Sequence, residues 1–110
     1  MKKVRKAGTR LEANLGRVGM AWYRPEQWQP LRQAFVDPDV LEATHAEWFE
    51  FATTKFNELE AVGVRVFKVD VDIEELIGWC RDQGLSVDDE SAAAFAAHKV
   101  QRMLNTPREF

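Results

Sequence analysis

The 110-residue sequence predicts a predominantly helical α+β domain in the order helix-helix-strand-helix-helix, with one short strand pair. Apolar residues recur at helical spacing in residues 38–62, 73–83 and 89–104, whereas residues 64–71 are β-branched and alternate with polar ones. The hydrophobic fraction (45%) and the charged fraction (30%) are those of a globular protein, and a chain of this length builds one core.

Charge divides the chain at residue 19. Residues 1–19 contain six bases and one acid (+5), whereas residues 20–110 contain nine bases and 17 acids (−8). We expect residues 1–19 to be a basic, partly disordered extension with at most a short weak helix between its glycines, and residues 20–110 to form the single domain. Met20 opens the first stretch that is typical of a folded domain, which raises it as an alternative start of the natural protein.

Two prolines and an Asp-Pro-Asp motif organise the first helices. Pro25 favours one helical turn at 25–28, and Pro30 predicts an interruption followed by a restart that runs to about Val36. Asp37-Pro38-Asp39 predicts the start of a long helix over 38–62, because it supplies an N-cap oxygen and a proline at the first helical position. Gly63 ends that helix.

The predicted strand, 64–71, needs a partner. Its apolar phase slips between Val66 and Phe67, and a β-bulge would absorb the slip. The only other candidate strand is the weak one at residues 18–23. We therefore expect the strand to pair either with 18–23 or with its own copy across the two-fold axis of a dimer.

Capping motifs mark the last two helices. Asp72, with Glu75 three residues later, predicts the start of the helix 73–83, and Gly84 ends it. Asp88 or Asp89 caps a final helix that runs to about Leu104.

Several short motifs in residues 20–104 carry a resemblance to known sequences. These are Ala21-Trp22-Tyr23-Arg24-Pro25-Glu26-Gln27-Trp28, Asp37-Pro38-Asp39, Val69-Asp70-Val71-Asp72, and Trp79-Cys80 followed by Gly84-Leu85 and Val87-Asp88. In these motifs the chain resembles a group of short uncharacterised bacterial proteins. The resemblance covers residues 20 to about 104, implies no activity, and supports Met20 as the natural start.

Residues suited to catalysis are sparse, and we assign no catalytic residue, metal site or cofactor. Glu42 and His45 are three apart, as in carboxylate-bridged metal sites on helices, but such a site needs a second pair, which only a dimer would provide. Cys80 is expected to be a small core residue. The carboxylates at the strand-to-helix junction, Asp70 and Asp72 among them, are explained by capping and by the helix dipole.

Aromatic residues exceed what one helix face can bury, which hints at a subunit interface. The candidate interface residues are Trp22, Tyr23, Trp28, Trp48, Phe49, Phe51, Val66 and Phe67. The expected function is that of a small protein-interaction domain that acts through homodimerisation. An unknown protein partner is a further option, and a metal-dependent enzyme with Glu42 and His45 at a dimer interface is an alternative.

The basic extension suggests another alternative, a nucleic-acid-associated protein. Its candidate contacts are Lys2, Lys3, Arg5, Lys6 and Arg10. The acidic remainder of the chain opposes this hypothesis because it would repel phosphates. Bases also stand where a signal peptide would need its apolar region, and no run approaches the ~18 apolar residues of a membrane span, so we expect a cytoplasmic protein without a membrane partner.

Overall fold

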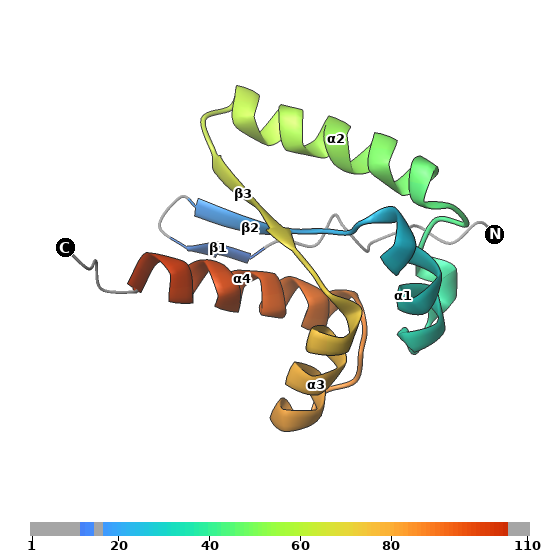
Figure 1. Cartoon of the computed structure of the whole chain (residues 1–110). Helices are drawn as coiled ribbons and strands as arrows, with labels where there is room; N and C mark the ends of the chain where they lie inside the picture. Colours follow the sequence, from blue (N-terminus) through green and yellow to red (C-terminus); the bar gives the residue numbers. More distant parts are fainter. Residues whose placement is uncertain (1–11, 15–16, 106–110) are drawn as a thin grey trace.

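The computed structural model describes residues 12–14 and 17–105 and confirms the predominantly helical α+β class (Figure 1). In chain order the elements are β1 (Glu12–Asn14), β2 (Arg17–Trp22), the 3₁₀ turn η1 (Pro25–Gln27), α1 (Trp28–Ala34), the 3₁₀ turn η2 (Pro38–Val40), α2 (His45–Ala61), β3 (Arg65–Asp70), α3 (Ile73–Gln83) and α4 (Asp89–Asn105). Among the described residues, none of these helices has the length and apolar character needed to cross a membrane.

The predicted strand finds its partner within the chain. β3 pairs in parallel with β2, from Arg17 opposite Arg65 to Trp22 opposite Asp70. β1 adds a short antiparallel strand on the other edge of β2, so the sheet order is β1-β2-β3 and the weak helix expected near this segment is wrong. β2 also runs across the expected boundary at residue 19, and Val18 is buried.

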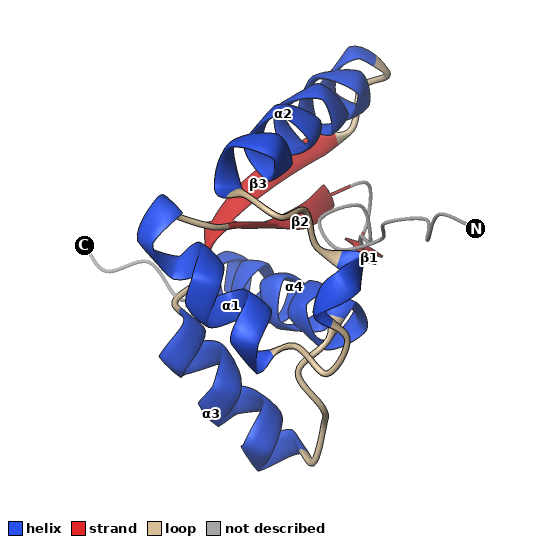
Figure 2. Cartoon of the chain, turned by 90° about the vertical axis from the view of Figure 1, so that its right-hand side faces the viewer, coloured by secondary structure: helices blue, strands red, loops and turns tan. Residues whose placement is uncertain are grey.

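The sheet is covered on both faces, with α2 on one side and α4 on the other (Figures 1 and 2). This explains the apolar slip in β3, because Val66 and Val69 point to opposite faces and both pack against the core. The register between β2 and β3 is continuous, so the predicted bulge is wrong.

Two helix starts differ from the prediction. Asp37-Pro38 begins only the turn η2, after which Leu41 is extended (φ −100°, ψ 146°). α2 begins later because Thr44 and Glu47 form a capping box, each side chain accepting a hydrogen bond from the other's backbone N–H. The single turn predicted at 25–28 is confirmed as η1. The helix that follows begins at Trp28 rather than near Pro30, because Pro30 lies in the first turn of α1, where the backbone N–H has no helical acceptor.

The starts of α3 and α4 and the ends of α2 and α3 are formed by the residues that the sequence predicted. Asp72 Oδ1 accepts hydrogen bonds from the backbone of Glu74 and Glu75 at 3.0 and 3.1 Å. Asp88 Oδ1 accepts from Ser91 N at 2.8 Å at the start of α4. Gly63 (φ 89°) and Gly84 (φ 71°) take the left-handed conformation that ends a helix.

The core lies between the sheet and the helices around it. Its largest fully buried side chains are those of Trp28, Trp48, Met20, Leu31, Leu76, Val71 and Cys80. At Gly19 the backbone of β2 touches α4, because a Cβ there would lie 2.8 Å from the carbonyl oxygen of Ala96. This close approach fixes the distance between the sheet and α4.

Candidate functional site

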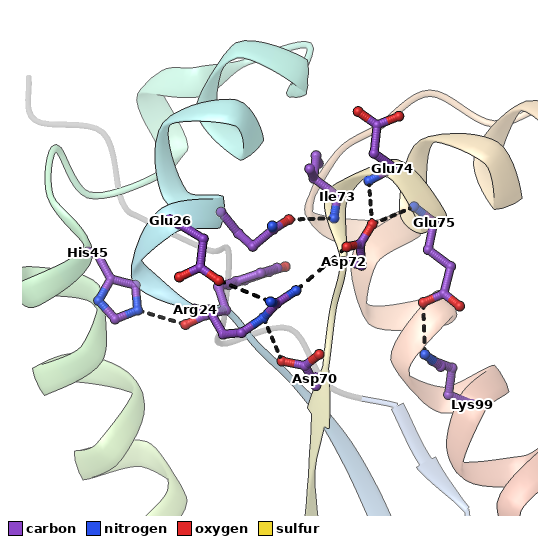
Figure 3. Close-up of polar contacts among 11 residues, drawn as sticks. Arg24, Glu26, His45, Asp70, Asp72, Ile73, Glu74, Glu75 and Lys99 are labelled. Carbon is purple, nitrogen blue, oxygen red and sulfur yellow. Dashed lines mark hydrogen bonds and ion pairs between the residues drawn. The ribbon is translucent and has the colours of Figure 1, made fainter.

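A cluster of ion pairs joins the carboxyl ends of β2 and β3 (Figure 3). Arg24 follows β2, and its guanidinium lies 3.1 Å from Asp70, 3.0 Å from Glu26 and 3.6 Å from Asp72. The four side chains are between 43% and 66% exposed. Ligand sites of open α/β sheets lie at this end of parallel strands, so the position is a natural candidate.

The groups of this cluster are, however, occupied in holding the fold. Gln27 Oε1 accepts a hydrogen bond from Ile73 N at 2.7 Å, and Asp72 caps the next two N–H groups of α3. The N-terminus of α3 is therefore closed to an anion. Within residues 12–14 and 17–105, no group of three or more His, Cys, Asp or Glu side chains is arranged to hold a metal ion. The cluster therefore ties the end of β2 to the start of α3.

The pairing of Glu42 with His45 loses its geometric basis. Because α2 begins at His45, Glu42 precedes the helix and the two residues do not share a helix face. The backbone of Glu42 is held by Trp28, whose indole N–H donates to Glu42 O at 3.1 Å. His45 Nε2 lies 2.7 Å from Tyr23 O, and its ring stacks on Phe49. The shared helix face on which the metal-dependent alternative relied is therefore not formed.

Most of the aromatic rings form one buried cluster. Trp48 lies at its centre, with ring centroids 5.2 Å from Trp22, 5.3 Å from Tyr23 and 5.5 Å from Trp28. Trp28 and Tyr23 are 2% exposed and Trp48 is 0% exposed. These three rings hold the N-terminal region against α2, and a partner would reach them only if the core opened.

Other members of the predicted interface set reach the surface. Phe49 is 47% exposed, and Trp22, Phe51, Val66 and Phe67 are half-buried. Cys80 is 1% exposed and lies in the core, as predicted. The interface itself stays a prediction, and its accessible members are the ones from which a surface can be built.

Lys68 adds a contact that the sequence pattern did not indicate. Its ammonium lies 4.4 Å from the ring centroid of Trp22 and 4.5 Å from that of Phe56. Cation–π contacts of this kind contribute about 0.5–1 kcal/mol at exposed sites. The side chain of Lys68 therefore covers an apolar part of the sheet face that packs against α2. Its ammonium group lies over the two rings.

The outer edge of β3 is open within the part of the chain that the structure describes, because the sheet ends at this strand. Val71 N donates to Trp22 O, so the alternation of the ladder turns the N–H and C=O groups of Val66, Lys68 and Asp70 away from β2. Glu60 accepts a long hydrogen bond, 3.4 Å, from Val66 N. No strand pairs with this edge among the described residues.

A groove runs beside that edge, between β3 and α4. It encloses about 390 Å³, and its apolar lining comes from Phe67, Val69, Val100 and Met103. Met103 is 55% exposed and Leu104, the next residue, is 39% exposed. The open edge thus has an apolar surface next to it.

The predicted nucleic-acid contacts, Lys2, Lys3, Arg5, Lys6 and Arg10, lie outside the described residues, so the nucleic-acid hypothesis stays a prediction.

No protein-family model, no curated protein and no solved structure matches this chain.

Proposed function

We propose that the protein is a small interaction domain that forms a homodimer by pairing the outer edge of β3 with the same edge of a second copy. The observation that carries the proposal is the open edge of β3 with an apolar groove beside it. Strand addition to such an edge gains main-chain hydrogen bonds, and neighbouring pockets take alternate side chains of the added strand.

Symmetry restricts how two β3 strands can meet. A two-fold axis perpendicular to the sheet makes them antiparallel, and residues that stand opposite each other then share a face. In the register centred on Phe67, the two Phe67 rings face each other on the α4 side of the sheet. Val66 then exchanges both hydrogen bonds with Lys68 of the second copy, which matches the outward direction of these groups and replaces the long bond from Val66 N to Glu60.

Charge selects this register over the neighbouring one. A register centred on Lys68 would place the two lysines directly opposite each other, and like charges in that position are destabilising. In the Phe67-centred register Lys68 faces Val66, and its ammonium stays with Trp22 and Phe56. The two rings therefore shield the charge of Lys68, so that this lysine does not protect the edge as unshielded lysines of edge strands do.

The apolar groove is the reason for proposing a second copy of this chain as the source of the added strand. Phe67 lines the groove together with Val100 and Met103, so a second Phe67 at the axis would cover the apolar side chains of both copies at once. Aromatic pairs contribute ~0.5–1.5 kcal/mol beyond the area they bury. Each copy thus contributes the same surface, its Phe67 and its groove, to the contact.

Lys68→Pro tests the proposal, with Lys68→Ala as its matched control. Proline removes an N–H that points away from β2, so the ladder with β2 remains, and edge strands tolerate proline. Light scattering at high micromolar concentration should give twice the chain mass of 12.7 kDa for the unchanged protein and for Lys68→Ala, and the single-chain mass for Lys68→Pro. A single-chain mass for the unchanged protein would refute the proposal.

A further inference from the structure

A second hollow lies between α3 and α4, and Lys99 lines both this hollow and the groove beside β3. The second hollow encloses about 430 Å³, and its lining includes Glu74, Gly78, Trp79 and Asp82 from α3 and His98 and Lys99 from α4. Figure 1 shows that α3 runs at a steep angle to α4. The inference drawn from it does not depend on the proposed dimer.

One wall of the cleft is aromatic. The ring of Trp79 lies 5.4 Å from that of Phe95 and 5.7 Å from that of His98, with both pairs tilted. Phe95 is buried, whereas Trp79 is half-buried and His98 is exposed. The half-buried indole therefore offers a firmly supported surface on which a planar group can stack.

Some of the charged groups that line the cleft are paired and others are not. Lys99 is already matched, since its ammonium lies 2.9 Å from Glu75 and 5.4 Å from the ring centroid of Phe95. The carboxylates of Glu74 and Asp82 form no ion pair with any residue in the described part of the chain. Arg102 is on the opposite rim, on α4. The rim formed by α3 thus has two carboxylates that form no such ion pair, together with the guanidinium of Arg81, whose Nη2 lies 3.7 Å from the Cβ position of Gly78.

Gly78 lines the cleft between these carboxylates, one helical turn from each. A Cβ at this position would meet only Arg81 Nη2, at 3.7 Å, and the backbone is not in the left-handed conformation. Neither packing nor backbone geometry therefore requires glycine. A glycine inside a helix costs roughly 1 kcal/mol relative to alanine, so Gly78 lowers the stability of α3 without a packing reason for it.

We infer that the cleft between α3 and α4 binds a guanidinium group, the side chain of a peptidyl arginine. The planar cation stacks on Trp79, and its N–H groups donate to the carboxylates of Glu74 and Asp82. Guanidinium fits this combination better than ammonium does, because it is planar, weakly hydrated and carries five N–H donors. Both its face and its edge then find a partner in the cleft.

The test titrates the full chain with N-acetyl-arginine amide and follows the indole N–H resonance of Trp79, which a Trp79→Phe variant assigns. The matched control ligand is the citrulline compound, which has the same shape without the charge. We expect arginine to shift the resonance with a Kd on the order of 1 mM, as is usual for a few exposed contacts, and citrulline to bind at least tenfold more weakly. Equal shifts with the two ligands would overturn the inference.

Two variants distinguish the cleft from general charge attraction. Glu74→Gln with Asp82→Asn should weaken arginine binding at least fivefold, whereas the control, Glu50→Gln with Glu58→Gln, removes the same charge from α2 and should leave binding unchanged. Gly78→Leu should abolish binding while the thermal midpoint stays the same or rises. Binding that the Glu74/Asp82 and Glu50/Glu58 variants reduce equally would overturn the site, as would binding that survives Gly78→Leu.

The arginine could come from another protein or from the chain's own basic segment, which contains Arg5 and Arg10. Replacing both with glutamine separates these sources. Tighter binding of the added ligand to that variant would identify the chain's own segment as a competitor, and unchanged binding would identify an external peptide as the source. Either result follows from an arginine-binding cleft, and loss of binding would contradict it.

Discussion

Replacing Gly19 with alanine tests how closely the sheet approaches α4. The added Cβ would lie 2.8 Å from the carbonyl oxygen of Ala96 and 2.8 Å from Cγ2 of Val100. The first of these atoms belongs to helix backbone, so it moves only if α4 moves. Forcing an extra carbon into a packed core costs ~1–3 kcal/mol, whereas removing glycine from a strand recovers about 0.5–1 kcal/mol. We expect a net loss of about 1–2 kcal/mol.

Gly78→Ala is the matched control, because its Cβ would meet only Arg81 Nη2 at 3.7 Å. Alanine in this helix should raise the free energy of unfolding by up to about 1 kcal/mol. Urea unfolding followed by tryptophan fluorescence measures both changes, at one fixed protein concentration because the proposed dimer would couple stability to concentration. The reasoning fails if Gly19→Ala is as stable as the unchanged protein, or if the two variants shift the midpoint in the same direction.

Three further substitutions follow from contacts in the fold. Thr44→Ala should lower the free energy of unfolding by about 1 kcal/mol because it removes the N-cap of α2. Its control, Thr54→Ala, lies on the exposed face of the same helix and should change the free energy of unfolding by less than about 0.5 kcal/mol. Equal urea midpoints for the two variants would contradict this. Asp72→Ala should cost ~1 kcal/mol by the same mechanism at α3, and a loss of circular dichroism at 222 nm would accompany it. Arg24→Gln should cost at most about 1 kcal/mol, since its ion pairs are half-exposed, and the difference should shrink in 1 M salt; a loss that salt leaves unchanged would count against an electrostatic role.

Local chemistry explains which elements could be predicted. Helix caps and helix-ending glycines act within a few residues of their own position, so the helix ends that they mark can be predicted from the sequence. Examples are Asp72, Asp88, Gly63 and Gly84. The start of α2 was misplaced because Asp37-Pro38 and Thr44 are both good helix starts. Which of them begins α2 depends on Trp28, which holds the intervening loop through Glu42 O.

Tertiary arrangement explains what could not be predicted. The slip in β3 indicated a bulge, but its cause is a sheet covered on both faces, which depends on where α2 and α4 pack. The aromatic excess was expected to lie partly at an interface, yet Trp48 and Trp28 are buried by residues distant in the sequence. The contact of Lys68 with two rings likewise joins three separate elements, so no local pattern indicates it.

The β3 dimer is tested most directly by a cysteine at position 67, in a background in which the buried Cys80 is replaced by alanine. In the Phe67-centred register the two copies of this position face each other as a non-hydrogen-bonded pair, with Cα atoms ~4.5 Å apart, within the range that a disulfide spans. The two copies of Arg65 would instead be displaced by four residues, about 13 Å, so Arg65→Cys is the control. Mild oxidation should give a covalent dimer with Phe67→Cys and little with Arg65→Cys. Equal yields from the two variants would contradict the proposed pairing.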